Sequence, residues 1–183
     1  MAVNPVYRTH IEEIKKELRK KTSLPSVQLL DFFEKKEYAL LKKKMEQLQL
    51  SPKKKLQQFS YQKALVPASF FPRYFLSFLK LVLGQEPKQW TAYSMQWKDY
   101  CLLHDRLVEK NGTDIILDFS ERWPENAGGA IIYGDGEGDV YSLATQHNTL
   151  SLIIRKKSFQ KYFQYVNHYG KKQERKFIIG NKG

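Results

Sequence analysis

The sequence predicts an α+β fold, with helices in the N-terminal half of the chain and strands in the C-terminal half. Before Pro87, apolar residues recur at the three- and four-residue spacing of amphipathic helices, and after it they alternate with polar residues as in half-buried strands. Seven or eight short strands separated by tight turns indicate a sandwich or barrel. With 183 residues, 42% of them hydrophobic, the chain can bury a core of its own. We expect the helices to pack against one face of the sheet.

Three helices are expected, each with its own start or stop signal. The first is a short basic helix that includes Leu18 on a narrow apolar stripe. Ser26 is a suitable N-cap for a second helix over residues 27–48. Pro72 and Gly84 mark the start and the end of a third, because proline suits a first helical position and glycine a helix stop.

The expected domain organisation is an N-terminal basic helix over residues 1–24 followed by a single domain over residues 25–183. Within that domain, residues 25–87 would form a helical support and residues 88–183 a β-barrel. The run of three lysines in residues 51–55 is expected to be a charged turn. No internal repeat, long linker or low-complexity tract divides the chain.

The strands are predicted from the alternation of apolar and polar residues. They are expected over residues 90–97, 100–104, 114–119, 130–133, 140–144, 149–154, 161–166 and 176–179. Between two of them, residues 134–139 alternate glycine with acidic side chains. This segment lacks the spacing and the distal glutamate of an EF-hand calcium loop, so a glycine-rich hairpin is expected there.

Positive charge is concentrated in the N-terminal half. Residues 1–100 contain 19 Lys and Arg against 9 Asp and Glu, whereas residues 101–183 contain 12 against 10. Such a field favours encounters with polyanions such as nucleic acid or the ribosome. The alternative interpretation is a solvated basic surface. The candidate polyanion-binding residues are Lys42, Lys43, Lys44, Lys53, Lys54 and Lys55.

Composition excludes several classes of protein. The single cysteine, Cys101, excludes an internal disulfide and a multi-cysteine zinc site and fits a reducing compartment. No signal-peptide-like run occurs at the N-terminus, and no stretch approaches the roughly 18 apolar residues of a membrane span. A soluble, cytoplasmic protein is therefore expected. The sequence also lacks a Walker motif, a glycine-rich dinucleotide fingerprint and a Gly-x-Ser-x-Gly elbow.

A series of short motifs follows a defined order along the C-terminal half. In chain order they are Tyr100 to His104-Asp105-Arg106, the turn from Trp123 to Gly128-Gly129, Asn148-Thr149-Leu150, Ser158-Phe159-Gln160 and the strand that begins at Arg175. This order resembles the C-terminal barrel of the iron(II)- and 2-oxoglutarate-dependent oxygenases of the prolyl-hydroxylase type, over roughly residues 26–183. The resemblance implies a double-stranded β-helix, that is, a jelly-roll or cupin-like barrel.

The resemblance also implies a particular chemistry. In that family two histidines and one carboxylate hold iron(II) on one face, and a basic residue pairs with the distal carboxylate of 2-oxoglutarate. His104 stands at the position of the first histidine, Arg175 at that of the 2-oxoglutarate-binding arginine, and Tyr100 at that of a tyrosine lining the co-substrate pocket. Iron(II) and 2-oxoglutarate would be the cofactors of an active enzyme, and a protein residue its substrate.

The departures from the family pattern fall on the metal ligands. Arg106 stands where the carboxylate of the His-x-Asp motif should be, and a guanidinium disfavours a metal cation. The distal histidine should fall at Gln160 or at Phe163, and neither is histidine. The weaker candidate ligands that remain are Asp105 and His168.

Three functions compete. The first is a catalytically degenerate oxygenase-fold protein, a pseudoenzyme that binds a protein, nucleic acid or small anion. Arg106, Arg175 and Tyr100 would hold the anion, with Gln160 and Asn148 in the pocket. The second is an active iron(II)/2-oxoglutarate-dependent protein hydroxylase with unconventional ligands. The third is a basic protein that associates with nucleic acid or the ribosome through its N-terminal helices, without a recognisable RNA-binding motif.

Overall fold

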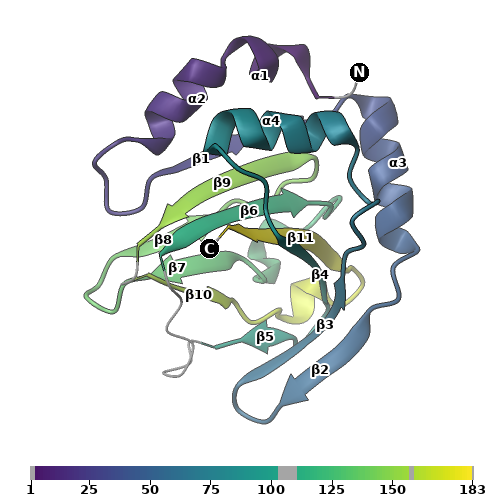
Figure 1. Ribbon diagram of the computed structural model, residues 1–183. Coiled ribbons are helices and arrows are strands. Elements are labelled where there is room, and N and C mark those ends of the chain that lie inside the picture. Colours follow the sequence, from purple (N-terminus) through teal and green to yellow (C-terminus); the bar gives the residue numbers. More distant parts are fainter. Residues whose placement is uncertain (1–2, 103–110, 157–158, 183) are drawn as a thin grey trace.

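The strands form one antiparallel sheet that curls back on itself into two facing layers (Figure 1). The computed structural model describes residues 3–102, 111–156 and 159–182. The larger layer contains, in spatial order, β1 (Ser26–Leu29), β9 (Thr149–Arg155), β6 (Gly112–Asp118), β11 (Arg175–Lys182) and β4 (Gln89–Met95). The smaller layer contains β5 (Tyr100–Cys101), β10 (Gln160–Phe163), β7 (Ile131–Gly134) and β8 (Val140–Leu143).

One strand joins the two layers. The end of β3 (Phe59–Leu65) pairs with β4 of the larger layer, and its start pairs with β5 of the smaller one. β2 (Ser51–Lys55) pairs with β3 as the outer strand of a hairpin. This arrangement is the double-stranded β-helix, or jelly-roll, that the sequence predicts.

Helices cover the outer face of the larger layer (Figure 1). They are α1 (Pro5–Thr9), α2 (Ile11–Leu18), α3 (Lys35–Glu46) and α4 (Arg73–Leu83). Two short 3-10 turns, η1 (Glu125–Ala127) and η2 (His168–Gly170), lie in the connections of the barrel. The prediction for α4 is confirmed: it begins just after Pro72 and ends at Gly84, which has the left-handed φ of 79°.

Two predictions for the N-terminal half are wrong. Residues 27–34 are not helical, because Ser26–Leu29 form β1, which pairs with β9, and the helix starts only at Lys35. Residues 51–55 are not a turn, because they form β2. The predicted helical support therefore contributes three strands to the sheet. β1 depends on long-range pairing with β9 and β2 on the hairpin with β3, and in each case hydrogen bonds to a neighbouring strand satisfy the backbone as well as a helix does.

The alternation of side chains along the larger layer divides the apolar residues into two cores. On β6, Ile115 and Leu117 face the helices, whereas Ile116 faces the barrel interior. The outer core between sheet and helices also contains Phe75, and the inner core between the layers contains Phe177. No helix in the described parts of the chain is long and apolar enough to cross a membrane.

Candidate functional site

A buried carboxylate lies inside the barrel at the start of β6. Asp114 has the same orientation as Ile116, two residues further along the strand, so its side chain enters the interior, where it has 0% exposure. Its Oδ2 accepts hydrogen bonds from the Tyr133 hydroxyl at 2.8 Å, from Lys161 Nζ at 3.1 Å and from Arg155 Nε at 3.3 Å. Strands of both layers therefore meet at one oxygen atom. We call Asp114, Tyr133, Arg155 and Lys161 the Asp114 cluster.

The Asp114 cluster carries two cations and one carboxylate. Burial would raise the pKa of Asp114, but the charges of Lys161 and Arg155 and the Tyr133 hydroxyl outweigh it and hold the pKa below its ordinary value. The carboxylate is therefore ionised at neutral pH. Its second oxygen, Oδ1, has no hydrogen-bond partner in the part of the chain that the structure describes.

A second buried ion pair lies at the other end of β6. Arg175, at the start of β11, is 1% exposed, and its Nη2 donates to Asp118 Oδ2 at 3.2 Å. Burial lowers the pKa of the Arg175 guanidinium, and the Asp118 carboxylate opposes this effect. The Nε and Nη1 groups of Arg175 have no hydrogen-bond partner among the described residues.

The tryptophan–glycine turn packs over Arg175. Trp123 Nε1 donates to the carbonyl oxygen of Gly128 at 2.9 Å. Gly129 has a φ of 72°, and a Cβ at this position would lie 3.1 Å from the Trp123 ring and 3.5 Å from Cδ of Arg175. A side chain here would be strained and crowded, so glycine lets the turn approach the arginine closely.

Aromatic rings fill the barrel interior beside the two ionic groups. Phe163 follows Lys161 by two residues on β10, and Phe177 follows Arg175 by two residues on β11, so each faces inward with its partner. Their ring centroids are 5.2 Å apart, and Tyr93 lies 5.2–5.3 Å from both. These packed rings are hydrophobic core, which binds the two layers together.

The predicted metal-site residues are only partly placed. His104, Asp105 and Arg106 lie outside the described residues, and their roles stay predictions. His168 is exposed in η2, where its ring packs on Tyr169 at a centroid distance of 4.1 Å. The preceding residue, Asn167, donates from its backbone to Ala127.

The predicted pocket residues are placed apart from one another. Tyr100 is half-buried on β5, and Gln160 is half-buried at the start of β10, opposite Gly134. Asn148 is buried, and its side-chain amide bonds both the backbone N–H and the carbonyl of Phe33 at 2.9 Å. Asn148 thus fastens the segment before α3 to the start of β9.

The six candidate polyanion-binding lysines divide between two elements. On α3, Lys42 pairs with Glu121 at 2.8 Å and Lys44 donates to the carbonyl of Phe70 at 2.8 Å, while Lys43 is exposed. Lys53, Lys54 and Lys55 are all exposed on β2. Lysines on an exposed outer strand also protect a sheet edge against aggregation, so polyanion binding by these residues stays a prediction.

Sequence reasoning missed most of the buried polar residues. A signal was present, because the strand Asp114-Ile-Ile-Leu-Asp118 carries charges at both ends of an apolar run. On a strand buried on both faces, such charges need partners. The partners Lys161 and Arg155 could not be chosen from the many cations of the chain without the barrel geometry.

Several solved structures have a similar fold at low sequence identity. A prolyl hydroxylase from Trichoplax adhaerens, solved with a fragment of the hypoxia-inducible-factor oxygen degradation domain, has a TM-score of 0.74 at 8% identity, covering 98% of this chain and 93% of its own. A prolyl-4-hydroxylase from Pseudomonas putida has a TM-score of 0.69 at 9% identity, with coverages of 94% and 98%.

A third similar structure is not named as a prolyl hydroxylase. A 2-oxoglutarate–iron(II) oxygenase-family protein from Burkholderia pseudomallei has a TM-score of 0.66 at 10% identity, covering 94% of this chain and 90% of its own. No protein-family model and no curated protein sequence matches the chain. The chain therefore has the fold of prolyl-hydroxylase-type 2-oxoglutarate oxygenases.

Several features of the described residues bear on the cofactors of those oxygenases, while the predicted ligands His104 and Asp105 lie outside the described residues. Among them, no group of three His, Cys, Asp or Glu side chains could hold a metal ion. The inward carboxylate of Asp114 already contacts two cations, which would repel a metal ion. Nη2 of Arg175 is paired with Asp118, whose negative charge weakens the binding of a dicarboxylate there, while Nε and Nη1 have no partner among the described residues.

Proposed function

We propose that this prolyl-hydroxylase-type barrel acts as a binding or scaffold module and does not catalyse 2-oxoglutarate-dependent oxidation. The observation that carries the proposal is the Asp114 cluster, in which a carboxylate inside the barrel is bound by Lys161, Arg155 and Tyr133. A carboxylate that serves a metal must leave its oxygen free for the ion. Here Oδ2 accepts all three hydrogen bonds, and although Oδ1 has no partner among the described residues, the two cations beside the carboxylate disfavour a metal ion.

Two departures in sequence support the same proposal. By the resemblance, Arg106 stands where the family has the carboxylate of the His-x-Asp motif, and Gln160 or Phe163 stands where it has the distal histidine. The Arg175–Asp118 ion pair gives further support. By the resemblance Arg175 would bind 2-oxoglutarate, but here its guanidinium binds the carboxylate of Asp118. A barrel that serves as a scaffold needs no metal ligands, and its interior charges can pair with one another. Both features support the proposal.

The proposed partner is a protein or peptide. The Trichoplax adhaerens prolyl hydroxylase was solved with a peptide fragment, which supports peptide binding on this fold. The jelly-roll can keep such a surface when its chemistry is lost, because binding residues lie on connections positioned by a rigid scaffold.

The test is an anaerobic titration of the purified protein with iron(II), with and without 2-oxoglutarate, followed by a succinate assay in air. We expect no stoichiometric iron binding, no charge-transfer absorption and no succinate. Stoichiometric iron with that absorption would overturn the proposal and show that the protein binds iron(II) through ligands other than those of the family motif. A prolyl hydroxylase of the same fold, titrated in parallel, serves as the positive control.

A second candidate is a barrel that binds a small anion without iron. The observation in its favour is that Nε and Nη1 of Arg175 lack hydrogen-bond partners among the described residues. Saturable binding of 2-oxoglutarate without iron, measured by isothermal titration calorimetry and lost in Arg175→Lys, would support it. Lysine keeps the charge but cannot offer the planar donor pair, so this variant tests the guanidinium itself.

A further inference from the structure

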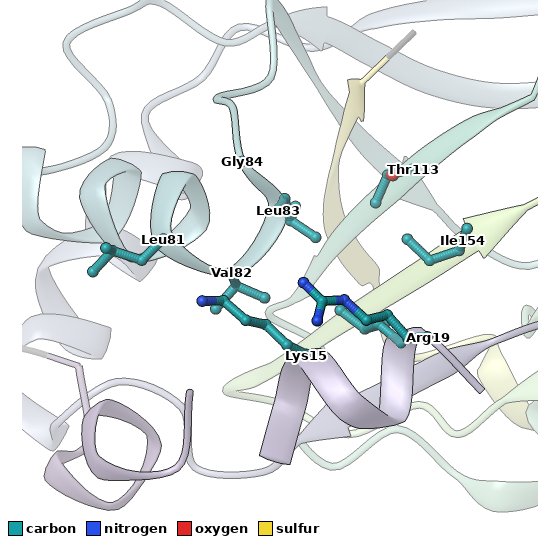
Figure 2. A pocket seen from close by; sticks show the side chains of 9 residues that line it. Lys15, Arg19, Leu81, Val82, Leu83, Gly84, Thr113 and Ile154 are labelled. Carbon is teal, nitrogen blue, oxygen red and sulfur yellow. The ribbon is translucent and has the colours of Figure 1, made fainter. Parts of the chain in front are cut away.

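A pocket of about 450 Å³ lies outside the barrel, between the helices and the paired ends of β6 and β9. Figure 2 shows its lining: Lys15 comes from α2 and Arg19 is the C-cap residue of that helix, Leu81 and Val82 come from the last turn of α4, and Thr113 and Ile154 from β6 and β9. The pocket therefore forms only when the N-terminal helix docks onto the sheet. Its volume is within the range of small-molecule sites, about 300–1,000 Å³.

The charged side of the pocket is cationic. Arg19, the C-cap residue of α2, follows Lys15 by four residues, so the two side chains lie on the same side of the helix end. In Figure 2 their charged groups lie near each other and point into the same space, beside Val82. Lys15 pairs with the exposed carboxylate of Glu12 at 2.7 Å, and this hydrogen bond together with the charges of Lys15 and Arg19 lowers the pKa of Glu12. Two neighbouring cations of like charge favour an anion between them.

The other walls of the pocket are apolar. Val82 is 7% exposed and Ile154 is partly buried, so they form a firm apolar surface below the cations. Leu81 is 59% exposed, which leaves a large apolar side chain at the mouth of the pocket. Thr113 adds a hydroxyl group on the sheet side. The pocket thus has cationic side chains, Lys15 and Arg19, on one side and apolar side chains, Val82 and Ile154, on the other.

We propose that this pocket binds a small organic anion with an apolar body, of the class of medium-chain carboxylates. The anionic head would lie between Lys15 and Arg19, where charge-assisted hydrogen bonds are strong. The apolar body would cover Leu81, Val82 and Ile154, whose burial is favourable. This site is separate from the barrel interior and does not depend on the proposed loss of catalysis.

A structural role for the same cations makes a different prediction. Positive side chains near a helix C-terminus stabilise its free carbonyl groups, and the last turn of α4 forms one wall of the pocket. If Lys15 and Arg19 served only this purpose, their removal would lower the melting temperature without affecting ligand binding.

The experiment measures octanoate binding to the full chain by isothermal titration calorimetry, with acetate and 1-octanol as the head-only and tail-only probes. We expect octanoate to bind at least tenfold more tightly than either probe. The variant Lys15→Gln/Arg19→Gln should weaken octanoate binding about tenfold, and Leu81→Asn should weaken it by a smaller factor. Circular dichroism verifies that each variant is folded.

The matched control is Lys16→Gln/Lys21→Gln, which removes the same charge from exposed lysines that do not line the pocket. We expect it to bind octanoate as the unmodified chain does. Equal loss in both double variants would show general charge attraction and overturn the proposal. Octanoate binding no tighter than that of 1-octanol, or unchanged binding with a lower melting temperature in Lys15→Gln/Arg19→Gln, would overturn it as well.

Discussion

The two faces of the larger layer differ in how they are stabilised. The outer face, towards the helices, is apolar: Ile115, Leu117 and Ile178 pack there against α4 and its neighbours. The inner face of the same strands carries buried ion pairs at two places: Asp114 pairs with Arg155 and Lys161, and Asp118 pairs with Arg175. Adjacent residues of one strand thus belong to two different physical environments.

The two faces are stabilised by different kinds of interaction. Burial of apolar area stabilises the outer face without requiring particular partners. On the inner face each charged side chain needs its specific partner, because burying an unpaired ion costs roughly several kcal/mol of desolvation free energy. A protein with hydrophobic residues of similar volume in place of a buried ion pair is often as stable. The buried charges of this barrel are therefore not needed for stability as such, and each one is paired with another group of the same chain.

The largest expected effect comes from removing the inner carboxylate. Asp114→Ala takes away the anion that Lys161 and Arg155 both contact, and we expect a loss of about 3–5 kcal/mol in the free energy of unfolding. Urea unfolding followed by circular dichroism measures it. In a Lys161→Met background the same substitution should cost less, because one cation no longer needs a partner. Additive costs would mean that the two side chains do not interact energetically.

The outer face should respond to volume and not to charge. Gly180 lies opposite Trp90 in the β11–β4 pairing, and a Cβ there would be 2.5–2.9 Å from three atoms of the Trp90 ring. Gly180→Ala should therefore destabilise the protein by about 1–3 kcal/mol through overpacking. The loss should shrink in a Trp90→Phe background, whose smaller ring leaves room. An equal loss in both backgrounds would show that the indole is not the obstacle.

The smallest of the three effects is a dependence on pH, since protonation keeps the shape of the side chain. The pKa of Asp114 is lower in the folded chain than the unfolded value of about 3.9, so its contribution is fully present above that value. As the pH falls through about 4 and towards the lower folded pKa, the unfolded chain binds the proton first and stability declines.

Urea unfolding between pH 7 and pH 3 checks this dependence by comparing the unmodified chain with Asp114→Asn. The variant should be less stable at neutral pH and should lose less stability on acidification. Parallel pH profiles would show that other carboxylates, and not Asp114, govern the acid response.

Much of the fold could be predicted because its signals are local. Pro72 and Gly84 bracket α4 in the sequence as they do in the structure, and the glycine-rich segment 134–139 is the predicted hairpin between β7 and β8. β1 could not be predicted, because its four residues become a strand only by pairing with β9, more than a hundred residues away.

By itself the sequence indicated the helix between Pro72 and Gly84 and the strands of a barrel, and its motif order resembled a jelly-roll family with Arg106 and either Gln160 or Phe163 at the expected ligand positions. These depend on periodicity, turn chemistry and motif order, which are written along the chain. The tertiary structure alone decided which charges meet inside the barrel. Asp114 and Lys161 are distant in sequence, and only the closure of two layers brings the carboxylate and the ammonium to 3.1 Å. The energy of a buried charge depends on such distances, because its partners replace the water it has lost.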